Sequence, residues 1–229
     1  MKFDLIPRRA PLRLLVCAGF FLALALFTLT VTQTSSTALT GKLGITNRSF
    51  ATTRLVGATP CPWAFSDVGN VGIIGSASCD NGTMTVKGGG ADIWNSADAF
   101  HFEYQSLKGD GQIVARMTSQ QNTNAWAKAG LMIRENLTAS SRHASMFLTP
   151  FNGSIFQHRL TPSAGTTFAL GTYTPAPYWL KLVRAGNTFS GYTSADGNTW
   201  KLIGTQIVTM ATDVYIGLAV SSHIYGSLG

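Results

Sequence analysis

Short apolar runs, each closed by polar or turn-forming residues, recur along the chain from about residue 73 onward. The clearest pair is an apolar run at residues 129–134 and a second run at residues 143–149. Runs of this length are typical of strands and short for helices. The polar residues 136–141 between them supply turn chemistry, and Pro150 closes the second run. The pattern predicts an antiparallel pair of strands at the centre of an all-β sandwich.

Alternation of polar and apolar side chains extends this prediction to the neighbouring segments. In residues 98–107, Phe100 and Phe102 share one parity while His101 and Glu103 share the other, which predicts a half-buried strand. Further strands are predicted at residues 82–87, 112–118, 154–160, 178–183, 188–192 and 214–221, with hairpin turns at 80–82 and 184–187 and a polar loop at 161–171.

The first part of the chain has a different pattern. Residues 1–13 are basic, residues 14–31 form an apolar run of 18 residues without a charge, and small polar residues follow. This order is typical of a secretory signal peptide, with the cleavage point after Ala38. A retained N-terminal membrane anchor is the alternative, because about 18 apolar residues can just span a bilayer. Both alternatives predict a secreted or extracytoplasmic domain.

The chain is therefore divided into three parts. Residues 1–38 are predicted to be a signal peptide or membrane anchor that forms one N-terminal apolar helix. Residues 39–59 are predicted to be a linker, because they are rich in Thr and Gly and show little periodicity. Residues 60–229 are predicted to be the β-sandwich domain. In the anchored form the basic end would stay in the cytoplasm and the domain would lie outside.

Charge narrows the choice of partners. The formal net charge is +7, but no run of Lys or Arg occurs after Arg13. The sequence lacks the aromatic and basic stripe that binds single-stranded nucleic acid. We expect no nucleic-acid partner, and contact with a membrane only through the N-terminal segment if it is retained.

Two cysteines remain once the N-terminal segment is set aside. Cys61 and Cys79 are expected to form a disulfide, because exported domains fold in oxidising compartments. Two separate buried thiols are the alternative.

Several short motifs resemble those of one known family. Residues 126–134 (WAKAGLMIR), 141–143 (SRH) and 149–153 (TPFNG) are the clearest. Shorter matches occur at residues 91–94, 98–101, 109–111, 119–122 and 194–197. In this order they resemble secreted concanavalin A-like β-sandwich domains, labelled DUF1349 or "regulation of enolase protein 1-like".

The resemblance implies a jelly-roll sandwich of two antiparallel sheets. It also implies a non-catalytic module, since the family is mostly known in that form. A further strand normally follows the segment that begins near Ser221 in this family. The sequence ends at Gly229, so we expect this strand to be missing and the chain to be C-terminally truncated.

The sequence shows no residue spacing typical of a glycosidase or metal-dependent active site. Glu103 and Glu135 are the only glutamates, and neither has an acidic residue two positions away, as glycosidases of this architecture do. The four histidines form no metal-binding pair. We therefore predict no enzyme activity, no catalytic residues, no metal and no cofactor.

Once catalysis is set aside, the function class left for this domain is non-covalent binding of a ligand. The candidate platforms for stacking on a sugar are tryptophans, and the candidate hydrogen-bonding groups are polar side chains inside predicted strands, which need water, a ligand or a partner. The candidate ligand-binding residues are Trp94, Trp126, Arg134, Gln157, Arg159, Trp179 and Lys181. Core packing is the competing interpretation for each tryptophan.

We predict non-catalytic binding of a polysaccharide, a cell-surface glycan or other cell-surface material on the concave sheet. One alternative is a structural or adhesion domain that contacts protein partners. A glycoside hydrolase-like enzyme is the other.

Overall fold

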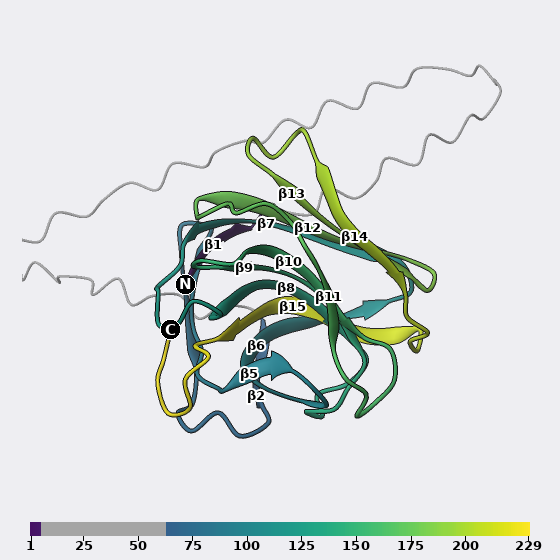
Figure 1. The fold of residues 1–229 in the computed structure, drawn as a ribbon, viewed down its shortest axis with the longest axis horizontal. Coiled ribbons are helices and arrows are strands. Elements are labelled where there is room, and N and C mark those ends of the chain that lie inside the picture. The colour runs from purple at the N-terminus through teal and green to yellow at the C-terminus, as the bar shows by residue number, and fades with distance from the viewer. Residues whose placement is uncertain (6–62) are drawn as a thin grey trace, which may run out of the picture. The chain divides into compact units, whose positions relative to one another are not determined.

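The computed structural model describes residues 1–5 and 63–229, and every helix or strand assigned in these ranges is a β-strand. The strands form two antiparallel sheets stacked as a sandwich (Figure 1). This confirms the predicted all-β class with two antiparallel sheets. The predicted apolar helix and the linker at residues 39–59 lie outside the described residues. Within the described ranges, no helix is long and apolar enough to cross a membrane.

The first sheet, sheet A, has seven strands in the described part of the chain. Their spatial order is β14 (Lys201–Ile207), β13 (Thr188–Ser194), β12 (Tyr178–Ala185), β7 (Gly111–Ser119), β1 (Lys2–Leu5), β4 (Thr83–Lys87) and β3 (Ser76–Asp80).

The second sheet, sheet B, has eight described strands. Seven follow the order β11 (Thr167–Leu170), β10 (Gly153–Arg159), β9 (His143–Thr149), β8 (Lys128–Arg134), β15 (Asp213–Ser221), β6 (Ala97–Lys108) and β2 (Ala64–Val68). The eighth strand, β5 (Asp92–Trp94), pairs with the start of β6 beside this path.

Strands β8 and β9 are the predicted antiparallel pair, and they lie in the middle of sheet B. Leu131 of β8 is opposite Met146 of β9. Every residue of both strands is buried. Both faces of the pair are therefore covered, which explains why their apolar runs are nearly continuous and do not alternate.

Alternate side chains of sheet B enter two separate cores. Leu131 packs with Leu180 of sheet A in the main core between the sheets. Met132 and Phe147 have the opposite parity and pack with Ile93 of β5 in a second core on the outer face. Each fully buried side chain of this size contributes about 1.5–3 kcal/mol relative to an exposed one. The second core holds β5 over the outer face of sheet B.

Strand β1 was not expected from the sequence, because residues 1–38 were assigned to an export segment. In the structure β1 lies between β4 and β7, where Phe3 is opposite Met84 on one side and Met117 on the other. Phe3 is 0% exposed and belongs to the main core. The first five residues alternate like a strand, but a segment this short carries too little pattern to outweigh the apolar run that follows.

The two ends of the chain lie side by side (Figure 1). The Val86 amide donates a hydrogen bond to the Met1 carbonyl at 2.8 Å. Two residues further along, Gly88 exchanges hydrogen bonds with Gly229 at 3.1 and 3.4 Å. Gly229 therefore pairs just beyond the end of β4, whereas Met1 pairs with β4 itself.

Two features differ from the prediction in detail. Strand β6 was expected to be half-buried, yet His101 and Glu103 are 0% and 2% exposed. His101 is covered because the backbone at Gly75 packs directly on its ring. Residues 161–171 were expected to be a polar loop, but they contain β11, which pairs with β10 through main-chain hydrogen bonds. Such edge pairing depends on β10 and is not visible in the local pattern.

Both predicted hairpins are present. Strands β3 and β4 pair across Asn81 and Gly82, which have positive φ angles of 47° and 84°. Positive φ at both positions is the requirement of the two-residue turn that Asn-Gly favours. Strands β12 and β13 form the second hairpin.

Candidate functional site

A pocket of about 360 Å³ is lined by residues from sheet B, β5 and the loops beside them. Gln157 on β10 lines it and has the opposite parity to Phe156, which belongs to the main core. The pocket therefore lies on the outer face of sheet B, away from sheet A. Its lining residues are Asp92, Trp94, Trp126, Lys128, Ile155, Gln157, Phe168 and His223. A pocket of this size falls within the usual range for small-molecule sites.

Aromatic rings form much of the wall. Trp94 of β5 and Phe168 of β11 lie with their ring centroids 5.4 Å apart and their planes at 60°. Trp126 precedes β8 and is 38% exposed, so part of its ring is available to a ligand. The Lys128 ammonium lies 5.8 Å from the centre of that ring. The wall thus offers flat apolar surfaces next to polar groups.

Lys128, Asp92 and His223 form a chain of polar contacts on one side of the pocket. The Lys128 Nζ atom lies 2.5 Å from Asp92 Oδ1. The His223 Nε2 atom lies 3.2 Å from Asp92 Oδ2. The side chains of Asp92 and His223 are 24% and 28% exposed, whereas that of Lys128 is 3% exposed. The Asp92 carboxylate is therefore accessible to a ligand, whereas the ammonium group of its partner Lys128 is shielded from solvent.

Gln157 completes the polar lining and is fully buried at 0% exposure. Its Nε2 atom donates a hydrogen bond to the Ile93 carbonyl. Its Oε1 atom has no hydrogen-bond partner in the structure. Burying a polar atom without a partner costs about 1–3 kcal/mol. A ligand that donates a hydrogen bond to this oxygen would remove that cost.

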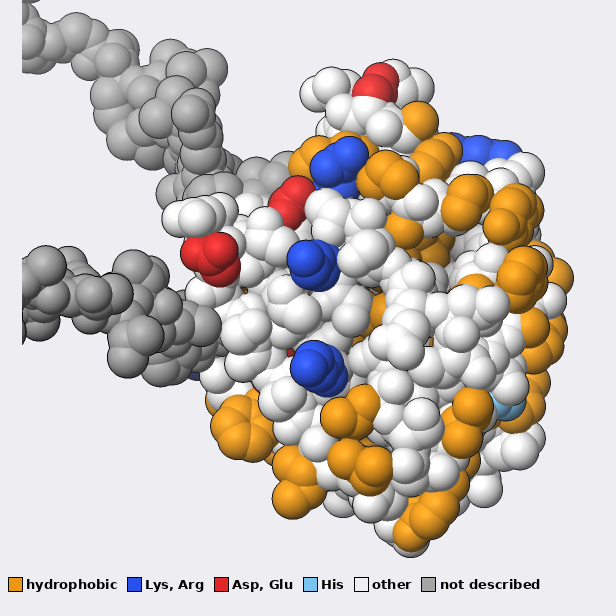
Figure 2. All heavy atoms as spheres, turned by 90° about the vertical axis from the view of Figure 1, so that its left-hand side faces the viewer, with side chains coloured by type: hydrophobic (Ala, Val, Ile, Leu, Met, Phe, Trp, Pro, Cys, Tyr) orange, Lys and Arg blue, Asp and Glu red, His pale blue; other side chains and the backbone are white. Residues whose placement is uncertain are grey.

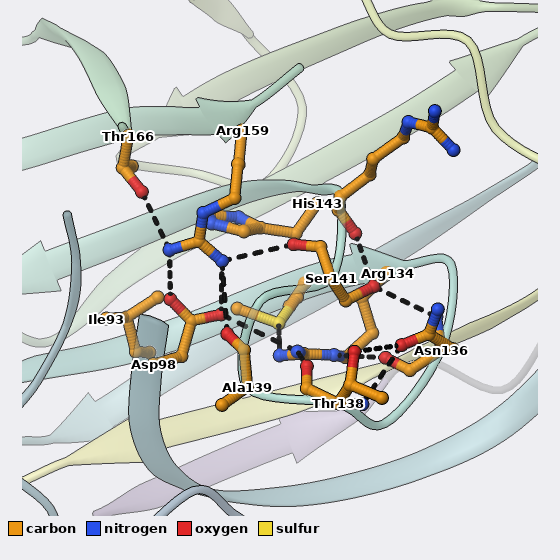
Figure 3. A network of polar contacts seen from close by, with 12 residues as sticks. Ile93, Asp98, Arg134, Asn136, Thr138, Ala139, Ser141, His143, Arg159 and Thr166 are labelled. Atoms are coloured by element: carbon orange, nitrogen blue, oxygen red, sulfur yellow. Dashed lines mark hydrogen bonds and ion pairs between the residues drawn. The ribbon is translucent and has the colours of Figure 1, made fainter. Parts of the chain in front are cut away.

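A buried arginine cluster lies on the same face of sheet B (Figure 3). Arg159 of β10 holds Asp98 of β6 with two hydrogen bonds, of 2.6 and 2.9 Å. Arg134 of β8 lies 3.5 Å from the same carboxylate. Arg134 also donates to the carbonyl oxygens of Asn136 and Thr138. None of these three buried side chains lines the pocket, and the guanidinium groups are occupied by Asp98 and loop carbonyls, so the cluster fixes the loops and offers no group to a ligand.

Burial and charge set the protonation of this cluster. Burial raises the pKa of Asp98, and the hydrogen bond from Arg159 with the charge of Arg134 opposes that shift. Burial lowers the pKa of Arg134 to about 10, which leaves the guanidinium charged at neutral pH. Burial, reinforced by the charges of the two arginines, holds the pKa of His143 well below its usual value. His143 is therefore neutral beside two cations.

The candidate ligand-binding residues fall into three groups in the structure. Trp94, Trp126 and Gln157 meet in the pocket. Arg134 and Arg159 belong to the buried cluster and are not accessible. Trp179 and Lys181 lie on β12 of sheet A, away from the pocket.

Trp179 and Lys181 share one face of β12, as their spacing predicted. The Lys181 ammonium lies 4.2 Å from the Trp200 ring centre and 4.6 Å from that of Tyr192. Trp179 packs against Gly197 in the turn after β13. Burial lowers the pKa of Lys181. This aromatic patch is a separate feature of sheet A.

Five pocket residues were not among the sequence-derived candidates: Asp92, Lys128, Ile155, Phe168 and His223. Asp92 lies two residues before the candidate Trp94 on the short strand β5, so the spacing in the sequence could have indicated that both side chains share a face. Lys128 stands at the start of a strand that is otherwise apolar, which is a usable signal for a buried, paired charge. The neighbouring sequence gives no sign that Phe168 or His223 would line a pocket, because long-range packing decides where these side chains lie.

A second polar cluster lies at the start of β6, between β6 and β2. The ring nitrogens of His101 lie 2.8 Å from Asp67 Oδ1 and 3.0 Å from Glu103 Oε1. Burial alone would lower the pKa of His101, but the hydrogen bonds to Glu103 and Asp67 raise it above its usual value. Since both ring nitrogens face carboxylates, the cluster favours a doubly protonated ring and joins edge strand β2 to sheet B.

The described ranges contain no metal-binding cluster, and one face of them shows no basic patch. Residues 1–5 and 63–229 contain no group of three or more His, Cys, Asp or Glu side chains that could hold a metal ion. On the face shown in Figure 2, Lys and Arg side chains stand apart and do not gather into one patch.

Cys79 of β3 is disulfide-bonded. Cys61 lies outside the described residues, so the Cys61–Cys79 pairing stays a prediction.

No family model and no curated protein matches the sequence. Among solved structures, the chain is similar to a functionally unknown protein from Saccharomyces cerevisiae, with a TM-score of 0.54 and 17% identity. That match covers 67% of this chain and 85% of the yeast protein.

Two further similarities are more distant. The carbohydrate-binding module CBM66 from Bacillus subtilis matches with a TM-score of 0.44 and 16% identity, over 70% of this chain and 92% of that one. LamAcat from Zobellia galactanivorans matches with a TM-score of 0.42 and 8% identity, over 66% of this chain and 72% of that one. At these identities, what the chain shares with the yeast protein is the overall β-sandwich fold.

Proposed function

We propose that this protein binds carbohydrate without covalent chemistry, in the pocket on the outer face of sheet B. The observation that carries the proposal is the combination of aromatic walls with a buried, unpartnered amide oxygen at Gln157. Sugars have apolar C–H faces that pack on aromatic rings, and hydroxyl groups that donate hydrogen bonds. Trp94, Trp126 and Phe168 supply the rings, and Gln157 and Asp92 supply the acceptors.

A binding function is preferred over hydrolysis because of the carboxylates. A glycosidase needs two carboxyl groups roughly 5–10 Å apart across the scissile bond. Asp92 is the only carboxylate among the described residues that line the pocket, and it already contacts Lys128 and His223. Asp98 is sealed in the arginine cluster with no exposure. The proposal is therefore a non-catalytic module.

The family and the detailed fold are part of the same proposal. We assign the chain to the concanavalin A-like jelly rolls of the DUF1349, or "regulation of enolase protein 1-like", family. The motifs at residues 126–134 and 149–153 support this assignment, since they form the central strand β8 and the turn after β9. The two antiparallel sheets agree with it.

Export is a separate proposal. It is supported by the apolar run at residues 14–31 and by the disulfide at Cys79, because disulfides persist in oxidising compartments. It has one structural consequence. Cleavage after Ala38 would remove β1, and a membrane span at residues 14–31 would put β1 on the opposite side from β4 and β7. In an exported form of the protein, sheet A would therefore lack strand β1.

A protein partner is the second candidate function. The observation that favours it is the exposed apolar surface on the edge strands, where Leu170 of β11 is 55% exposed and Leu202 of β14 is 51% exposed. Exposed apolar side chains on sheet edges are available for contact with another chain.

The test uses the full chain with its disulfide intact, on a glycan array and by calorimetry with the sugars that bind. Replacing both Trp94 and Trp126 by Ala should abolish binding while circular dichroism shows an unchanged fold. Trp179→Ala on sheet A is the matched control and should bind like the parent. Equal binding by the folded double variant would overturn the pocket assignment. A folded protein that binds no glycan would favour the protein-partner function.

A further inference from the structure

The pocket presents hydrogen-bond acceptors to a ligand. The Gln157 amide has a fixed orientation, because its NH₂ group donates to the Ile93 carbonyl and a flipped amide would put two oxygens together. Its Oε1 atom is left buried and without a partner. The second acceptor is Asp92, whose side chain is 24% exposed. A ligand that fits these atoms must bring its own donors.

The basic side chains that line the pocket, Lys128 and His223, both contact Asp92. The Lys128 side chain is 3% exposed, and its ammonium contacts Asp92 Oδ1 at 2.5 Å and the Trp126 carbonyl at 3.4 Å. His223 directs Nε2 to the other oxygen of Asp92 at 3.2 Å. The opposite charges of Lys128 and Asp92 cancel. Among the described lining residues, a negatively charged ligand would find no lysine or arginine without a carboxylate partner.

The two arginines on the same face do not change this conclusion. Arg134 and Arg159 are buried and, unlike Gln157, do not line the pocket. Arg159 donates to Asp98 and to surrounding carbonyl and hydroxyl oxygens, which include Asn95 and Thr166. Neither guanidinium has a solvent-exposed N–H group for a ligand carboxylate or sulfate. Recognition of acidic groups usually depends on such accessible guanidinium groups.

We propose that the pocket selects neutral, hydroxyl-rich sugars and rejects sugars that carry a carboxylate or a sulfate. The inference rests on the proposed carbohydrate-binding function and specifies its ligand class. A sugar hydroxyl donates to Gln157 Oε1, and a second hydroxyl donates to Asp92. An acidic sugar would place a negative charge against these two acceptors and lose its hydration without a compensating cation.

The experiment compares matched ligand pairs on the wild-type full chain. Neutral oligosaccharides of glucose, mannose, galactose and fructose are titrated by calorimetry. Each neutral oligosaccharide that binds is then compared with its derivative in which primary hydroxyls are oxidised to carboxylates. We expect the oxidised form to bind at least about tenfold more weakly, which corresponds to about 1.4 kcal/mol. We also expect affinity for the neutral form to change little with added salt.

A variant tests the acceptor itself. Gln157→Met keeps the length of the side chain but removes the oxygen, and it should lose at least about tenfold in affinity for the neutral sugar. Gln112→Met, at an exposed position on sheet A, is the matched control and should bind normally. The wild-type comparison remains decisive if Gln157→Met does not fold.

The outcomes separate the inference from the proposed function. Oxidised sugars that bind as well as neutral ones, or better, would overturn the selectivity and leave carbohydrate binding in place. Unchanged neutral-sugar affinity in folded Gln157→Met would overturn the role of its oxygen. A folded wild-type protein that binds no sugar of either kind would overturn both proposals.

Discussion

Arg159 and Asp98 form a two-pronged ion pair with no exposure to solvent. The Nη2–Oδ1 distance is 2.6 Å and the Nη1–Oδ2 distance is 2.9 Å. The pair joins β10 to the start of β6, and the loop carbonyls of Ala139 and Ser141 also accept hydrogen bonds from Arg159. Since Gln157 lies two residues away on the same face of β10, this pair fixes the strand that supports the pocket.

Removal of the Asp98 charge should strongly destabilise the protein. Asp98→Asn leaves Arg134 and Arg159 buried without their carboxylate, and loss of one partner of a buried pair typically costs about 3–5 kcal/mol. The free energy of unfolding in urea measures this cost. Arg116→Ala is the control, because its contact with Asp4 is exposed and 3.7 Å long. It should cost about 1 kcal/mol or less. Equal effects of the two substitutions would contradict the structural role of the buried pair.

The His101 cluster should make stability depend on pH. Because the pKa of His101 is raised in the folded state, its contribution is fully present below the unfolded value of 6.5 and is lost as pH rises through the folded pKa. The stability advantage of wild type over His101→Gln should therefore shrink between pH 6.5 and pH 9. Urea unfolding of both proteins at several pH values tests this. The buried His143 does not interfere, since its lowered pKa confines its titration to pH values below about 6.5. A constant difference across this range would refute the prediction.

Replacing Phe3 tests whether β1 belongs to the working protein. Phe3 is fully buried between β4 and β7, so Phe3→Ala should cost about 3–5 kcal/mol in unfolding experiments on the full chain. Lys2→Ala is the control, because Lys2 is exposed on the same strand. An intact-mass measurement of protein from its native host shows directly whether residues 1–38 are retained. Unchanged stability in Phe3→Ala would mean that β1 is out of the sheet, as export requires.

The Trp179 and Lys181 patch should not contribute to the pocket. Lys181→Met should leave glycan affinity within about twofold of wild type, because the patch lies on sheet A. Its stability should fall by about 0.5–1 kcal/mol through loss of the contacts with Tyr192 and Trp200. Calorimetry and thermal unfolding give the two values. Loss of binding in a folded Lys181→Met variant would move the site to sheet A.

The disulfide at Cys79 should contribute to stability. Removal of a native disulfide typically costs about 2–5 kcal/mol, so Cys79→Ser should unfold at lower urea concentration than wild type. Peptide mapping without reduction should recover Cys61 linked to Cys79. A peptide that links Cys79 to Cys17 would show the predicted pairing to be wrong.

Most strands could be predicted because their information is local. The runs that became β8 and β9 have strand length and are closed by turn residues. The Asn81-Gly82 turn requires positive φ angles that these two residues tolerate. By contrast, β11 was missed because its four residues are held by pairing with β10, and β1 was missed because a longer apolar run follows it.

The sequence by itself determined the all-β class, the central strand pair and the hairpins, since side-chain alternation and turn chemistry act between near neighbours. Only the tertiary structure decided which polar residues meet. Asp92, Gln157 and His223 are far apart in the sequence, and β-strand pairing brings them to one pocket. The same packing buried Arg134 and Arg159, which the sequence had presented as ligand-binding groups. A strand pattern shows which side chains share a face, but burial depends on what covers that face. Here β5 and its loops cover the outer face of sheet B and leave the pocket open beside them.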